Sequence, residues 1–270
     1  QNGKVTARGN GETTITARTA NGKEAKCEVE VETGVSGIRI DKSKIKLDLS
    51  KNKTDKIEAT IEPSIATNKT IIATSSNEEI ATIDATGTIT AKKNGITTIS
   101  VKTANGKEAK CEVEVITSAT GIKMDKSVNI DLSKNKEEKI TVEVEPSTAS
   151  SKAVMIRSDN EEVATIDATG TIKGKKNGTA NIIATIPGTN ISATCKVKIT
   201  TSPTGIKLSK TSASLDMSGT KTVQLSATVK PTTATNKTIT WSSSNTKVAT
   251  VDKNGKVTAK KNGTATISVK

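Results

Sequence analysis

Cysteine is the residue type whose spacing first suggests chemistry in this chain. Cys27, Cys111 and Cys195 follow one another at intervals of 84 residues, and a thiolate can be a nucleophile, a metal ligand or a disulfide partner. Each cysteine stands alone, and histidine is absent from the sequence, so no metal site is predicted. Cysteines a whole domain apart would exceed the ~7 Å Cα separation of a disulfide. In Cys111–Val115 cysteine and valine alternate with glutamate, so we expect the thiols to pack in a core.

The residues that other kinds of enzyme catalysis require are not found in the necessary combinations. A serine nucleophile needs a general base, and neither histidine nor a Ser-x-x-Lys motif with its partner motifs is present. The paired carboxylates Glu78-Glu79 and Glu161-Glu162 are expected in surface turns, whereas a glycosidase needs two convergent carboxylates in a cleft. No catalytic, cofactor-binding or metal-binding residue is therefore predicted, and we expect no enzyme activity.

Charge is concentrated in one part of the chain. The net charge is +13, and residues 202–270 hold 11 basic and 2 acidic residues, a net of +9. Because the excess is local, and because the stacking residues Tyr and Phe are absent, no specific nucleic-acid binding is expected. No apolar run approaches the ~18 residues of a membrane helix, so no membrane insertion is expected.

The turn "KKNG" recurs at Lys92–Gly95, Lys175–Gly178 and Lys260–Gly263. One interpretation is a basic spot that contacts an anionic wall polymer. The other, which we favour, is a solvated hairpin whose lysines discourage edge-to-edge pairing.

An internal repeat must position all of these residues. The stretch "TANGKEAKCEVEV" occurs at Thr19–Val31 and again at Thr103–Val115, and Gly37, Gly121 and Gly205 share the 84-residue spacing. This length suits a small independent domain. We expect a partial domain at 1–33, complete domains at 34–117 and 118–201, and a domain without its last strand at 202–270.

Within one repeat the apolar residues alternate with polar ones. In "KIEATIE" (Lys56–Glu62) three apolar side chains share one face, and "KIKLDL", "TITAK", "TTISVK" and "KCEVEV" follow the same pattern. Asn94-Gly95 and Asn105-Gly106 are hairpin signals. Seven or so short strands in 84 residues predict an all-β fold of tandem Ig-like β-sandwiches.

The repeats also resemble a known family. "GIKLSK…LSATVKPTTATNKTITWSSSNTKVATVDKNGKVTAKKNGTATISV" (Gly205–Val269) is similar to the bacterial immunoglobulin-like domain, group 2, and the stretch Gly37–Val101 and its counterpart in 118–201 match it too. The resemblance implies tandem Ig-like sandwiches of bacterial surface proteins, adhesins and some phage structural proteins. Trp241 stands where the other repeats have Ala73 and Ile156, and we interpret it as a core residue.

Short joints suggest a mechanical role. The joints "VETGVSG", "VITSATG" and "ITTSPTG" contain no flexible Gly/Ser spacer. We expect a non-catalytic stalk or fibre segment of an extracellular, cell-surface protein. The alternatives are an adhesin that binds a surface receptor or wall polymer through loops or the basic last domain, and a phage decoration on a virion surface. The partial domains are explained either by a window cut from a longer array or by self-association, in which "KEAKCEVEV" (Lys23–Val31) completes the last domain of another copy.

Overall fold

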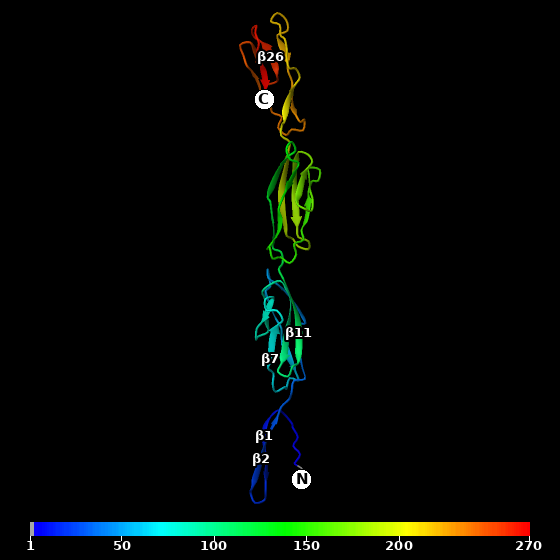
Figure 1. Ribbon diagram of the computed structural model, residues 1–270, viewed down its shortest axis with the longest axis vertical. Helices are drawn as coiled ribbons and strands as arrows, with labels where there is room; N and C mark the ends of the chain where they lie inside the picture. The colour runs from blue at the N-terminus through cyan, green and yellow to red at the C-terminus, as the bar shows by residue number, and fades with distance from the viewer. Residues whose placement is uncertain (1–2) are drawn as a thin grey trace. The chain divides into compact units, whose positions relative to one another are not determined.

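Every regular element in residues 3–270, which this computed structural model describes, is a β-strand (Figure 1). The chain divides into two compact units. Unit 1 contains Gln1–Thr120 and the segment Pro146–Lys152, and unit 2 contains Gly121–Glu145 and Ala153–Lys270. The four-domain boundaries expected from the sequence stay predictions, and the strands below are grouped by repeat.

The first hairpin of unit 1 is formed by β1 (Gly11–Arg18) and β2 (Glu24–Val31), which pair in antiparallel register with Ile15 opposite Cys27. Among the described residues, no second sheet covers either face of this hairpin. Cys27 is consequently exposed. The prediction that every cysteine packs in a core is wrong for Cys27, because strand alternation places a side chain on a face but does not supply the facing sheet.

The first repeat contains nine strands. They are β3 (Gly37–Ile40), β4 (Lys44–Asp48), β5 (Thr54–Lys56), β6 (Ala59–Glu62), β7 (Ile71–Ser75), β8 (Ala81–Ile83), β9 (Thr88–Ala91), β10 (Gly95–Thr103) and β11 (Glu108–Ile116). One sheet has the order β4-β11-β10-β7, and the strands of the other layer pair as β3-β6 and β5-β9-β8. β11 is central in its sheet because it pairs antiparallel with β10 and parallel with β4.

The second repeat, in unit 2, has the same plan. Its strands are β12 (Gly121–Met124), β13 (Ser127–Asp131), β14 (Glu137–Lys139), β15 (Val142–Glu145), β16 (Met155–Ser158), β17 (Ala164–Ile166), β18 (Thr171–Gly174), β19 (Gly178–Thr185) and β20 (Ser192–Thr200). The sheet β13-β20-β19-β16 faces the pair β12-β15 and the three-stranded sheet β14-β18-β17. Cys111 and Cys195 are fully buried in the two cores, which confirms the packing interpretation for these two thiols.

Seven strands form the third repeat. They are β21 (Gly205–Leu208), β22 (Thr222–Gln224), β23 (Ala227–Lys230), β24 (Trp241–Ser243), β25 (Ala249–Val251), β26 (Lys256–Ala259) and β27 (Ile267–Val269). The four-stranded sheet of the other repeats is here reduced to the pair β24-β27. In the described chain, no strand of this repeat stands in the position of β11.

Two local predictions differ from the structure. The alternation in Lys56–Glu62 is confirmed, because Ile57 is buried while its neighbours are exposed, but the stretch is not one strand. Lys56 ends β5, which pairs with β9, whereas β6 begins at Ala59 and pairs with β3. The chain therefore passes between sheets there, which the period of two alone does not reveal.

The second difference concerns the turns. Asn105-Gly106 joins β10 and β11 as a hairpin, with the Gly106 N–H donating to Thr103. Asn94-Gly95 does not make a hairpin, because β9 and β10 belong to different sheets. It is an arch between the layers, and a Cβ at Gly95 (φ +150°) would lie 2.7 Å from Cδ1 of Ile80. The interpretation of "KKNG" as a solvated hairpin is therefore wrong in its geometry.

Candidate functional site: the joints between repeats

A proline-containing turn of the following repeat presents polar atoms to each joint. In "PSIAT", "PSTAS" and "PTTAT" the alanine N–H donates to the proline carbonyl oxygen at 2.9 Å in every copy. The alanines (Ala66, Ala149 and Ala234) are buried. This turn projects the carbonyl that precedes the alanine and the hydroxyl that follows it.

These atoms take part in a recurring cluster that we call the clasp. It consists of an asparagine from the arch between sheets, a threonine that follows the last strand of the repeat, and the proline turn. The members are Asn10, Thr33, Ile65 and Thr67 in the first clasp, Asn94, Thr117, Thr148 and Ser150 in the second, and Asn177, Thr201, Thr233 and Thr235 in the third. The first two clasps lie within unit 1 and the third lies within unit 2.

The asparagine amide connects the other two parts of the clasp. Its Nδ2 donates to the carbonyl oxygen of Ile65, Thr148 or Thr233 at 2.7, 2.8 and 2.6 Å. Its Oδ1 accepts from the threonine hydroxyl at 2.6, 2.7 and 2.7 Å. Both ends of the amide are therefore used in every copy.

The threonine backbone pairs with the same proline turn. Its N–H donates to the turn hydroxyl at 2.9 Å in all three copies, and its carbonyl accepts from the backbone N–H of the turn residue at 3.0, 2.9 and 2.8 Å. Thr117 and Thr201 are each only 4 % exposed. Each clasp therefore contains four hydrogen bonds, one of which joins a backbone N–H to a backbone carbonyl.

An aspartate adds a further hydrogen bond to the last two clasps. Oδ1 of Asp48 accepts from the N–H of Ser118 at 3.0 Å, and Oδ1 of Asp131 accepts from the N–H of Ser202 at 2.9 Å. Hydrogen bonds from Ser202 and Ser133 hold the pKa of Asp131 far below its ordinary value. Burial would raise the pKa of Asp48, but hydrogen bonds from Ser118 outweigh it and the pKa is lowered.

The arrangement can restrain a joint but offers no reacting group. A neutral hydrogen bond contributes about 0.5–1.5 kcal/mol net, so four bonds provide a few kcal/mol at each joint before entropic costs. Sequence reasoning missed the clasp because it examined cysteine, charge and Asn-Gly hairpins. The available signal was the repeat spacing of asparagine and threonine: Asn10, Asn94 and Asn177 recur at intervals of 84 and 83 residues, and Thr33, Thr117 and Thr201 recur at intervals of 84.

The lysines of the arches have acidic neighbours in two repeats. Lys93 lies 3.9 Å from Glu79, and Lys176 lies 3.7 Å from Glu162. The paired carboxylates of the sequence are thus exposed partners of surface lysines. In the third repeat the matching positions are Lys261 and Lys247, so the glutamate of the pair is replaced by a second cation.

The described residues also include carboxylates and thiols that could form other kinds of site. No group of three or more His, Cys, Asp or Glu side chains there could hold a metal ion. Burial raises the pKa of the Cys111 and Cys195 thiols, which keeps them protonated and unreactive. In the part of the chain that the structure describes, no helix is long and apolar enough to cross a membrane.

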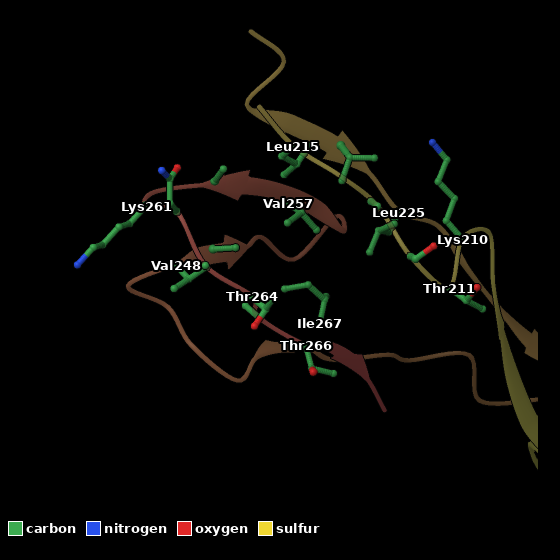
Figure 2. A pocket seen from close by; sticks show the side chains of 18 of the residues that line it. Lys210, Thr211, Leu215, Leu225, Val248, Val257, Lys261, Thr264, Thr266 and Ile267 are labelled. Atoms are coloured by element: carbon green, nitrogen blue, oxygen red, sulfur yellow. The ribbon is translucent and has the colours of Figure 1, made fainter. Parts of the chain in front are cut away.

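A groove of about 630 Å³ opens in the third repeat (Figure 2). Figure 2 shows the side chains of Leu215, Leu225, Val257 and Ile267 directed into it, while Lys210 and Lys261 extend away from it. Trp241 lies beside this region in β24, which pairs with β27, and is half-buried. The groove therefore contains apolar side chains together with threonines such as Thr264 and Thr266, and lysines lie at its borders.

The sequence was also compared with known proteins. A family model described as "Bacterial Ig-like domain (group 2)" matches residues 35–113, 119–197 and 203–270. An uncharacterised protein of Clostridium acetobutylicum is 32% identical over 168 residues, which are 61% of this chain and 17% of that protein. The kappa-carrageenase of Pseudoalteromonas carrageenovora is 42% identical over 66 residues, 24% of this chain and 17% of the enzyme. The chain thus spans about a sixth of the length of these relatives.

Solved structures with similar folds include two proteins with tandem domains. The immunoglobulin domains 1–5 of Sidekick-1 match with a TM-score of 0.43 at 11% identity, covering 94% of this chain and 61% of that one. Domains 1–6 of the surface layer protein SbsC match with a TM-score of 0.29 at 13% identity, covering 98% and 44%.

Proposed function

The chain belongs to the family of bacterial Ig-like domains (group 2), and from that premise we propose that it is a non-catalytic spacer of an extracellular or cell-surface bacterial protein. In this role it separates and presents other parts of the protein or of an assembly. The observation that carries the proposal is the clasp, which recurs with the same four hydrogen bonds at every joint. A site specific to one repeat would require that repeat to differ from the others, whereas a spacer requires the same joint each time.

The spacer proposal is tested at the joint between the second and third repeats, both within unit 2. Spin labels are placed at Lys139→Cys and Lys253→Cys, two exposed positions, in a chain that also carries Cys27→Ala. We expect a narrow distribution of label-to-label distances, because the clasp restrains the joint.

The matched variant adds Asn177→Ala and Thr201→Val, which remove two hydrogen bonds of this clasp and should broaden the distribution. The same pair of changes at Asn94 and Thr117 serves as the control and should leave it narrow. Equally broad distributions in all three chains would refute the restrained-spacer role.

A second candidate function is binding of an anionic surface polymer by the third repeat. It is favoured by the net charge of +9 in residues 202–270 and by Lys247, which stands where Glu79 and Glu162 neutralise the arch lysines elsewhere. Binding to polyglycerol phosphate, measured by titration calorimetry at several salt concentrations, tests this function. We expect weaker binding at higher salt and in Lys247→Glu, and binding unaffected by both would count against it.

A further inference from the structure

A groove of about 820 Å³, which we call the joint groove, lies where the second and third repeats meet within unit 2. The second repeat contributes residues that precede β14, the arch after β18 and part of the clasp. The third repeat contributes Pro231 and Thr233 of the proline turn, together with the joint residue Thr204. The volume falls within the range of ordinary ligand sites, about 300–1,000 Å³. A ligand of that size would contact both repeats at once.

The joint groove carries positive charge. Lysines provide four of its lining residues: Lys136, Lys173, Lys175 and Lys176. None of the described residues that line it is acidic. Lys173 and Lys176 have glutamate partners at 3.2 and 3.7 Å, whereas within residues 3–270 Lys136 and Lys175 form no ion pair. Two ammonium groups are therefore available to an anionic ligand.

The clasp supplies the polar part of the groove wall. Asn177 and Thr201 are occupied by their mutual hydrogen bond, and the Asn177 amide also donates to the carbonyl oxygen of Thr233. The Thr233 side chain is different, because the residue is exposed and its hydroxyl has no hydrogen-bond partner in the part of the chain that the structure describes. The joint groove thus offers two cations from the second repeat and one free hydroxyl from the third.

Both unpaired lysines recur with the repeat. Their counterparts are Lys53 and Lys92 in the first repeat, and Lys221 and Lys260 in the third. In every repeat the backbone carbonyl of the first lysine accepts a hydrogen bond from the residue directly before the second, at 2.8, 2.8 and 2.9 Å. This bond holds the two lysine positions on neighbouring segments, so the fold itself places both cations at the same end of each repeat.

The chemistry of the lining residues indicates the class of ligand. Lysine binds phosphate as a point charge, whereas planar carboxylates are matched best by the fork of arginine. Neither an arginine nor an aromatic side chain is among the described residues that line the joint groove, so it has no platform for stacking a sugar ring. We propose that the joint groove binds a segment of a phosphodiester-linked polyol polymer, which contacts Lys136 and Lys175 in the second repeat and Thr233 in the third.

Such a ligand also acts on the joint. Because its contacts come from both repeats, it binds best when the clasp holds the two sides of the groove together. Coupling of this kind is reciprocal, so the bound polymer restrains the joint in turn. The inference goes beyond the spacer role, because it gives the joint a partner that strengthens it.

Titration calorimetry with polyglycerol phosphate tests the site. Every chain carries Lys53→Gln and Lys92→Gln, which remove the matching cations of the first repeat. Adding Lys136→Gln and Lys175→Gln should weaken binding about 2- to 30-fold in total, and the weakening should diminish at high salt. The matched control adds Lys126→Gln and Lys198→Gln instead, two exposed lysines of the second repeat that lie outside the joint groove, and should bind as before.

A second pair of variants tests the contribution of the third repeat. Thr233→Val removes the free hydroxyl but keeps the backbone carbonyl that the clasp uses, and should weaken binding about 2- to 10-fold. The control Thr232→Val makes the same change at the neighbouring exposed residue, which does not line the joint groove, and should leave the affinity unchanged. Polygalacturonate, a carboxylate polymer, should bind more weakly than polyglycerol phosphate.

The spin-labelled chain tests the coupling. Asn177→Ala with Thr201→Val opens the clasp, so the apparent Kd for the polymer should rise as the fraction of closed joints falls. Saturating polyglycerol phosphate should narrow the broadened label-to-label distribution of this variant. An unchanged Kd together with an unchanged distribution would overturn the coupling between ligand and joint.

Three results would overturn the binding site itself: no binding of polyglycerol phosphate, equal weakening by the two lysine pairs, or equal binding of polygalacturonate. A loss with Lys247→Glu but none with Lys136→Gln and Lys175→Gln would support the second candidate function and overturn this proposal. None of these results alters the narrow distribution expected for the ligand-free clasp, so the spacer role is tested separately.

Discussion

The clasp makes a quantitative prediction about Asn177. This residue lies in the arch of the second repeat, yet its amide donates to Thr233 in the third repeat and accepts from Thr201 at the joint. Substitution Asn177→Ala removes both hydrogen bonds. At about 0.5–1.5 kcal/mol each, the loss is about 1–3 kcal/mol, and Thr201, only 4% exposed, is poorly placed to regain a water partner.

Trp241 makes the loss measurable in the neighbouring repeat. It is the single tryptophan of the chain, so its fluorescence during urea unfolding follows the third repeat alone. We expect Asn177→Ala to shift the Trp241 transition to lower urea with an unchanged slope. The double variant with Thr201→Val should lose less than the sum of the single losses, because the two residues share a hydrogen bond.

The matched control is Asn94→Ala, the same change in the second clasp, which lies in unit 1. It should leave the Trp241 transition where it is in the wild type. A transition that is equally unaffected by Asn177→Ala would show that the clasp does not couple the repeats, and the reasoning from its hydrogen bonds would be refuted.

Three further predictions follow from single sites. The pKa of Asp131 is lowered by its hydrogen bonds, so its stabilisation of the joint should be complete above about pH 4, the ordinary aspartate range, and should fade as the pH falls toward the folded-state pKa. The difference in urea midpoint between the wild type and Asp131→Asn should therefore shrink as the pH is lowered. A difference that stays constant with pH would contradict this prediction. Cys27 is exposed and Cys111 is buried with a raised pKa, so iodoacetamide should modify Cys27 in the native chain and Cys111 only after unfolding, as peptide mass spectrometry would show; equal modification would count against the core assignment. Gly95→Ala should destabilise the first repeat by about 1–3 kcal/mol, because the added Cβ would lie 2.7 Å from Cδ1 of Ile80 and the backbone φ is positive. Calorimetry should therefore show a lower melting temperature, and an unchanged melting temperature would contradict this prediction.

The fold class and the repeat can both be predicted from the linear sequence. Alternation with a period of two marks the buried faces correctly, as Ile57, Cys111 and Cys195 demonstrate, because successive side chains of an extended strand point to opposite faces. The 84-residue spacing and the family resemblance are likewise properties of the linear sequence. Both survive in the structure because each repeat builds the same core from the same local pattern.

The pairing of strands and the contacts between polar groups could not be predicted from local sequence and became visible in the folded chain. Alternation in Lys56–Glu62 continues while the chain changes sheets, and Asn94-Gly95 has a hairpin sequence but bridges two layers. The clasp joins Asn177 to Thr233, 56 residues away, and Cys27 is exposed although its sequence context equals that of Cys111. The physical reason is common to these cases: hydrogen-bond partners and burial depend on the segment that folds against a residue, and local sequence does not specify that segment.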